Sequence, residues 1–149
     1  MNGPGPNSYL RDAVLTASPE QLQLMLYDGA IRYARQGRDA MLAKDFEGTY
    51  EKLSRAQAIV SEMETGLRHE VNPELCDRMA SIYSFIFRKL VDASLTRDTE
   101  PIDAALKLLH MERETWVLLM EKVVSVKSDV ADQALVPASS EPGSLSVEG

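Results

Sequence analysis

The sequence has very few of the residues that form disulfides or bind metals. It contains one cysteine, Cys76, among 149 residues, so no internal disulfide can form. This cysteine usage is typical of a reducing compartment. There are two histidines, His69 and His110, with no HExxH motif and no paired Cys/His set to supply the three or four ligands that zinc requires. The sequence therefore predicts neither a metal site nor a cofactor.

Positive charge is also scarce. The chain has 16 lysines and arginines against 23 acidic residues, which gives a formal net charge of -7 at pH 7. Nucleic acids and anionic membranes are bound by basic surfaces, so neither is an expected partner. No apolar run approaches the roughly 20 residues needed to span a bilayer, and no secretion signal is visible at the start. These absences favour a cytoplasmic protein that does not insert into membranes.

Catalytic motifs are missing as well. We find no glycine-rich phosphate loop, no nucleophile elbow and no Ser/His/Asp set in the sequence. Cys76 has no histidine partner within reach along the chain and is predicted to be a small core residue. The sequence therefore predicts a protein that is not an enzyme.

Helical spacing with clear start signals is what the sequence does contain. Ser18 to Gln21 form a possible capping box with a proline in the first turn, and further starts are predicted at Asp45, Asn72 and Thr99. Four helices joined by short turns predict an all-α fold, an antiparallel up-down four-helix bundle. The expected domains are a flexible N-terminal arm that packs on the bundle (residues 1–17), the bundle (18–126) and a disordered tail (127–149).

The first predicted helix is apolar around most of its circumference. At about 100° per residue, its apolar side chains fall into two arcs turned roughly 120–200° from each other. The first arc holds Leu22, Met25, Leu26, Ala30 and Tyr33, and the second holds Leu24, Tyr27, Ile31 and Ala34. A bundle helix needs one apolar stripe somewhat over 100° wide. We therefore interpret the second arc as the wall of a binding groove.

The other helices also carry apolar residues outside their core stripes, and these extend the predicted groove. The expected groove residues are Leu24, Tyr27, Ile31, Ile59, Phe85, Met111 and Leu118. Such a groove suits an amphipathic helix of a partner. In the free protein we expect residues 9–17 to cover it.

Two polar residues of the last helix suggest further interpretations. Arg113 falls within the apolar arc, so it is predicted to bind a carbonyl or a carboxylate of a neighbouring helix. His110 leaves a histidine phosphotransfer protein as an alternative, although its neighbours in sequence, "LHMERE", offer little positive charge. A bundle that forms a homodimer through its surplus apolar surface is the other alternative.

The sequence resembles the flagellar secretion chaperone family FliS. The most specific block is "TASPEQLQLMLYDGAI", and it is followed in order by "LSRAQAIVSEMETGL", "MASIYSFIFRKLVDASLTRD" and "RETW". The resemblance implies a helical bundle that binds the disordered C-terminal segment of flagellin and prevents its premature polymerisation. It also implies delivery of flagellin to the flagellar type III export gate, through the cytosolic domain of FlhA.

The resemblance further assigns Tyr9 of the N-terminal arm to the partner-binding surface and to recognition of the export gate. The free protein is expected to be a monomer or a weak homodimer. The sequence departs from the family at Gly37, where alanine is common, and in its longer tail.

Overall fold

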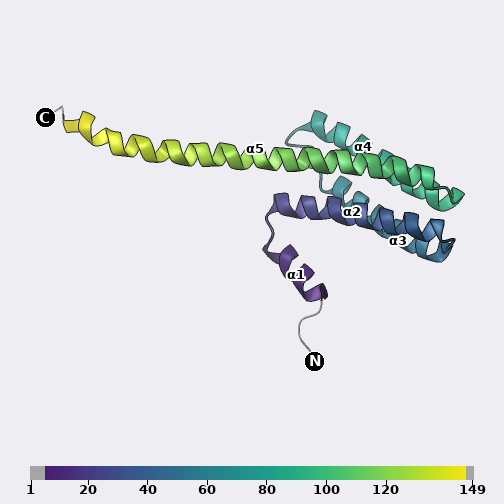
Figure 1. Cartoon of the computed structure of the whole chain (residues 1–149). Helices are drawn as coiled ribbons and strands as arrows, with labels where there is room; N and C mark the ends of the chain where they lie inside the picture. Colours follow the sequence, from purple (N-terminus) through teal and green to yellow (C-terminus); the bar gives the residue numbers. More distant parts are fainter. Residues whose placement is uncertain (1–5, 147–149) are drawn as a thin grey trace, which may run out of the picture. The chain divides into compact units, whose positions relative to one another are not determined.

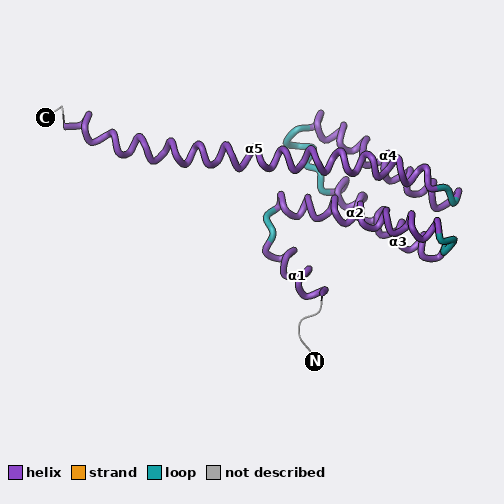
Figure 2. Tube along the Cα trace, in the orientation of Figure 1, coloured by secondary structure: helices purple, strands orange, loops and turns teal. Residues whose placement is uncertain are grey.

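The structure, a computed structural model, describes the backbone of residues 6–146 and the side chains of residues 8–134. The first five residues of the predicted arm lie outside the described residues. The helices are α1 (Pro6–Thr16), α2 (Pro19–Leu42), α3 (Phe46–Thr65), α4 (Pro73–Thr96) and α5 (Thr99–Ser146) (Figure 1). No strand occurs within residues 6–146 (Figure 2). The prediction of an all-α chain is confirmed, and the arm contains a helix of its own.

The chain divides into two compact units, Met1–Glu114 and Thr115–Gly149. The sequence predicts a division after residue 126 and a disordered tail from residue 127, whereas the structure continues α5 as a helix to Ser146. The side chains of residues 121–134 are exposed. The predicted domain limits therefore stay a prediction.

Short polar side chains begin three of the helices where the sequence predicts. Ser18 Oγ accepts a hydrogen bond from the Gln21 amide at 3.2 Å, and Gln21 Oε1 accepts one from the Ser18 amide at 3.0 Å. This is the predicted capping box. Asp45 caps α3 and Asn72 caps α4 in the same way, each through its side-chain oxygen. The caps satisfy amide groups that have no partner within their own helix.

One face of each helix from α2 to α5 builds the core of the first unit. The largest side chains with less than 2% exposure are Tyr83, Leu53, Ile86, Leu90, Ile102, Leu109 and Val60, together with Tyr27, which is 2% exposed. Burying a large apolar side chain contributes about 1.5–3 kcal/mol, so this set supplies much of the stability. Cys76 is 8% exposed and its thiol donates to the Arg68 carbonyl, which confirms it as a core residue.

Three of the four residues in the second apolar arc of α2, Tyr27, Ile31 and Ala34, face the core, while Leu24 is half-buried. Tyr27 is 2% exposed and Ile31 is 6% exposed, so their predicted placement on an accessible surface was wrong. The first arc lies beside α3, because the charged groups of Lys52 and Arg55 lie 5.8 and 5.7 Å from the centre of the Tyr33 ring. A helical wheel separates two arcs but does not say which one faces inward. Both arcs of α2 are used within the bundle.

Two glycines of α2 allow α3 to approach closely. A Cβ added at Gly37 would lie 2.6 Å from Leu53 Cδ2 and 2.9 Å from its Cγ, and one at Gly29 would lie 3.1 Å from Ile59 Cδ1. Leu53 is completely buried, so it has little room to move away. Gly37 therefore has a packing role.

We predict that Gly37→Ala lowers the free energy of unfolding by about 1 kcal/mol. The extra methyl overpacks the core at a cost of roughly 1–3 kcal/mol, which exceeds the gain of about 1 kcal/mol in helix propensity. Urea unfolding followed by circular dichroism measures the change. Gly66→Ala is the control, because its Cβ would lie 3.5 Å from the nearest atom, an ordinary contact. A Gly37→Ala protein as stable as the control would contradict the packing role.

Candidate partner-binding site

The eight residues predicted to bind a partner do not form one groove. Tyr9, Phe85, Met111 and Leu118 are exposed by 68%, 37%, 52% and 61%. Leu24 and Ile59 are half-buried, while Tyr27 and Ile31 belong to the core. Ile59 packs on the backbone of α2 at Gly29, and Leu118 belongs to the second unit. Phe85 and Met111 are the accessible groove residues on the helices of the first unit.

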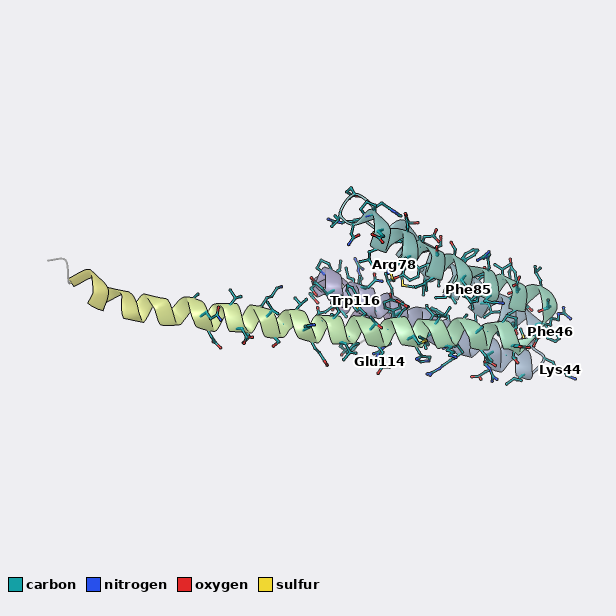
Figure 3. The ribbon with its side chains drawn as sticks, turned by 90° about the horizontal axis from the view of Figure 1, so that it is seen from above. Lys44, Phe46, Arg78, Phe85, Glu114 and Trp116 are labelled. Atoms are coloured by element: carbon teal, nitrogen blue, oxygen red, sulfur yellow. The ribbon has the colours of Figure 1, made fainter. Side chains whose placement is uncertain are left out.

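Phe85 lies on the flank of α4 that points away from α3. Ser84, about 100° around the helix from Phe85, faces α3, because its Oγ donates to Glu64 Oε1 at 3.3 Å. Leu75, Ile82 and Phe85 share the flank away from α3, seven and three residues apart. Leu75 is 48% exposed, and Lys89 Nζ lies 5.2 Å from the centre of the Phe85 ring, which Figure 3 labels on α4. These three residues, here called the α4 apolar flank, are reachable by a partner.

Met111 points away from the core on α5. The core positions of this helix are Ile102, Ala105 and Leu109, all with 0% exposure. Met111 is turned about 200° from Leu109, which explains its 52% exposure. Its predicted position outside the core stripe is confirmed.

The N-terminal arm is an exposed helix in this structure. Its large apolar side chains Tyr9, Leu10 and Leu15 are 68%, 54% and 70% exposed. The expected covering of the bundle by this segment is not seen at these side chains and stays a prediction.

Three side-chain contacts join α2 to the first turns of α5, and we call them the α2–α5 polar seam. Arg113 Nε donates to Asp28 at 2.5 Å, Arg35 contacts His110 Nε2 at 3.0 Å, and Arg38 Nε donates to Asp103 at 2.6 Å. Residue numbers rise along one helix as they fall along the other, so α2 and α5 run antiparallel. Contacts between side chains this exposed add little to stability, so the seam mainly aligns the helices.

The partner of Arg113 is the kind that the sequence predicts, a carboxylate on a neighbouring helix. The Arg113 side chain is 38% exposed, so it is less buried than its position in the apolar arc suggests. Its bond to Asp28 raises the pKa of the guanidinium further above its ordinary value.

A pocket of about 420 Å³ opens beside the polar seam. Its lining residues are Asp28, Ile31, Arg32, Arg35, Gln36, His110 and Arg113. The neighbours of His110 along the chain offer little positive charge, but α2 brings Arg32 and Arg35 to the same pocket. Arg35 is 75 residues from His110 in sequence, so the residues next to His110 along the chain do not indicate that an arginine lies beside it. We call this cavity the arginine pocket.

Two tyrosines form a buried polar pair between α2 and α4. The hydroxyl oxygens of Tyr27 and Tyr83 lie 2.7 Å apart, and Gln23 Nε2 donates to the Tyr83 hydroxyl at 3.3 Å. Burial raises the pKa of both phenols, so they remain protonated near neutral pH. Burial also raises the pKa of Glu112 on α5. No group of three residues that could hold a metal occurs among the described side chains.

Comparison with known proteins places this fold. The chain matches the family described as "Flagellar protein FliS" over residues 2–123. The chain belongs to the FliS family. It is 35% identical over 109 residues to the flagellar secretion chaperone FliS of Bacillus subtilis, which covers 73% of this chain and 80% of that protein. It is 31% identical over 114 residues to the FliS chaperone of Salmonella typhimurium, with 76% and 84% covered.

A solved structure agrees with the fold of this FliS-family chain. A structure described as "Crystal structure of flagellar chaperone from bacteria" superimposes with a TM-score of 0.66 at 19% identity, covering 80% of this chain and 99% of that one. FliS is a chaperone family, not an enzyme family. Within the described part of the chain, none of the helices is both long and apolar enough to traverse a lipid bilayer.

Partial burial raises the pKa of the Glu112 carboxyl group, and we expect this shift to make stability depend on pH in this FliS-family protein. In the folded state its pKa lies above the ordinary value of 4.5, which applies to the unfolded chain. In the pH range just above 4.5 the folded protein therefore binds the proton more tightly than the unfolded chain does. Stability therefore falls as pH rises through this window and stays lower at neutral pH. We predict that Glu112→Gln is more stable than the parent at pH 7, and that the difference shrinks as pH falls towards 4.

Thermal unfolding at a series of pH values measures this difference. Glu114→Gln is the matched control, because it removes the same charge from an exposed position on the same helix. Equal behaviour of the two variants across the pH series would show that burial of Glu112 has no energetic consequence.

Proposed function

We propose that this protein is a cytoplasmic export chaperone for flagellin. It binds the C-terminal segment of flagellin, prevents premature polymerisation, and delivers flagellin to the cytosolic domain of FlhA at the flagellar type III export gate. The observation that carries this proposal is the match to FliS along residues 2–123, with relatives named flagellar secretion chaperones. It acts without catalysis: binding protects the client, and transfer to the gate releases it.

The accessible apolar side chains support a client that arrives as a disordered segment. Phe85 and Met111 project from α4 and α5, and half-buried Leu24 and Ile59 add apolar surface on α2 and α3. A segment that folds into an amphipathic helix on such surfaces buries its own apolar face. Part of the contact energy is used to order the segment, so the affinity is lower than the buried area alone suggests.

The exposed arm has two roles in this proposal. Its apolar side chains occupy part of the client surface when no client is bound and leave it on binding. Tyr9, which is 68% exposed here, also contributes to recognition by the export gate. Leu118, which is 61% exposed in the second unit, stays a predicted client contact of its own.

We predict saturable one-to-one binding of the C-terminal segment of flagellin from the same organism, measured by calorimetry. Phe85→Asp weakens binding at least tenfold, because a charge enters the α4 apolar flank and must be desolvated. Tyr50→Asp is the matched control, an aromatic residue on α3 that is 68% exposed and lies outside this flank.

The outcomes separate the site from the function. If the folded parent protein does not bind the segment, the flagellin proposal fails. If the parent binds and Phe85→Asp binds equally well, flagellin is the client but the α4 apolar flank is not the surface that holds it.

A further inference from the structure

The arginine pocket concentrates positive charge on a protein whose formal charge is -7. Arg32, Arg35 and Arg113 all line it, and the side-chain amide of Gln36 adds hydrogen-bonding capacity. Ile31, which is 6% exposed, adds a buried apolar side chain to the lining. A concave site with several convergent polar groups and an apolar lining has the general form of a binding site.

Two of these three arginines have no carboxylate partner among the described residues. Asp28 neutralises Arg113, whereas Arg35 donates to Nε2 of His110, which can accept only as a neutral imidazole. Arg32 lies 5.1 Å from the centre of the Tyr33 ring, and neither Arg32 nor Arg35 is in a salt bridge with a described acidic residue. Two uncompensated guanidinium groups therefore line one cavity.

We infer that the arginine pocket binds a carboxylate side chain of the bound client, an inference that rests on the proposed chaperone function. Guanidinium groups bind carboxylates through two parallel hydrogen bonds, which makes this recognition directional. Two residues predicted to contact the client are close in sequence to residues that line the pocket. Leu24 precedes Asp28 by one helical turn, and Met111 follows His110 directly. A client helix on these apolar residues brings its own side chains to the pocket.

Charge favours a carboxylate on a polypeptide over a free multivalent anion. The net negative charge of the protein repels a small dianion such as phosphate more strongly than it repels a single carboxylate. A carboxylate on a segment already held by apolar contacts is present at an effective concentration on the order of millimolar.

The test compares client binding by the double variant Arg32→Gln/Arg35→Gln with that of the parent protein. The probe is the C-terminal segment of the organism's flagellin, titrated by calorimetry at low and at physiological salt. We expect the double variant to bind about tenfold more weakly and to lose most of the salt dependence. The control variant Arg68→Gln/Arg88→Gln removes the same charge from exposed residues outside the pocket and binds like the parent.

Changing each acidic residue of the flagellin segment to its amide, one at a time, identifies the carboxylate. We expect one of these changed segments to bind the parent protein about tenfold more weakly than the unchanged segment does. The same changed segment and the unchanged segment should bind the double variant equally well. Such coupling reports a direct interaction, which a general loss of charge or fold would not produce. Thermal unfolding checks that the double variant folds. If it does not fold, the single variant Arg32→Gln replaces it in the test, because this variant keeps the Arg35–His110 contact.

Each alternative outcome has a distinct meaning. If the parent binds the segment but the double variant binds equally well, or no amide change is coupled to it, the inference is overturned while the chaperone proposal stands. If millimolar phosphate binds the free protein through Arg32 and Arg35 and no segment carboxylate is coupled, the pocket is a small-anion site instead. If the parent does not bind the segment, both proposals fail together.

Discussion

The close approach of α2 to α3 sets the arrangement of the whole first unit. At Gly37 there is no room for a side chain, because Leu53 of α3 occupies the space where one would begin. Placing α3 against this side of α2 turns Tyr27 inward to meet Tyr83 of α4. It also directs Asp28 and Arg35 outward to the residues of α5. One steric contact thus fixes the rotation of α2, and that rotation decides which residues reach each neighbouring helix.

This rotation explains why α2 is apolar on most of its surface. A helix at the edge of a bundle buries one stripe, whereas α2 packs against α3 on one flank and contributes Tyr27 and Ile31 to the core. The remaining polar side of α2, which includes Asp28, Arg35 and Arg38, forms the polar seam with α5. Much of the apolar surplus of α2 is therefore used in packing, because Tyr27, Ala30, Ile31 and Ala34 are all buried.

The sequence predicted the features that depend on nearby residues. The capping box at Ser18, the caps at Asp45 and Asn72, and the exposure of Phe85 and Met111 follow from spacing within one helix. The inward face of α2 could not be predicted in this way, because both of its arcs are equally apolar. The position of arginines near His110 could not be predicted for a related reason. These arginines belong to another helix, and their distance from His110 depends on how the two helices align.

The two kinds of surface on this protein suit two different requirements of a chaperone. Apolar contacts are strong but non-directional, so the α4 apolar flank alone would accept many amphipathic segments in several registers. A bidentate pairing between a guanidinium group and a carboxylate has a narrow geometry and so selects one register. Because such a pair is exposed at its rim, it adds modest affinity, and its main effect is on which segment binds and how it is aligned. In the proposed function, where the client is released by transfer to the gate, this division provides selectivity without tight binding.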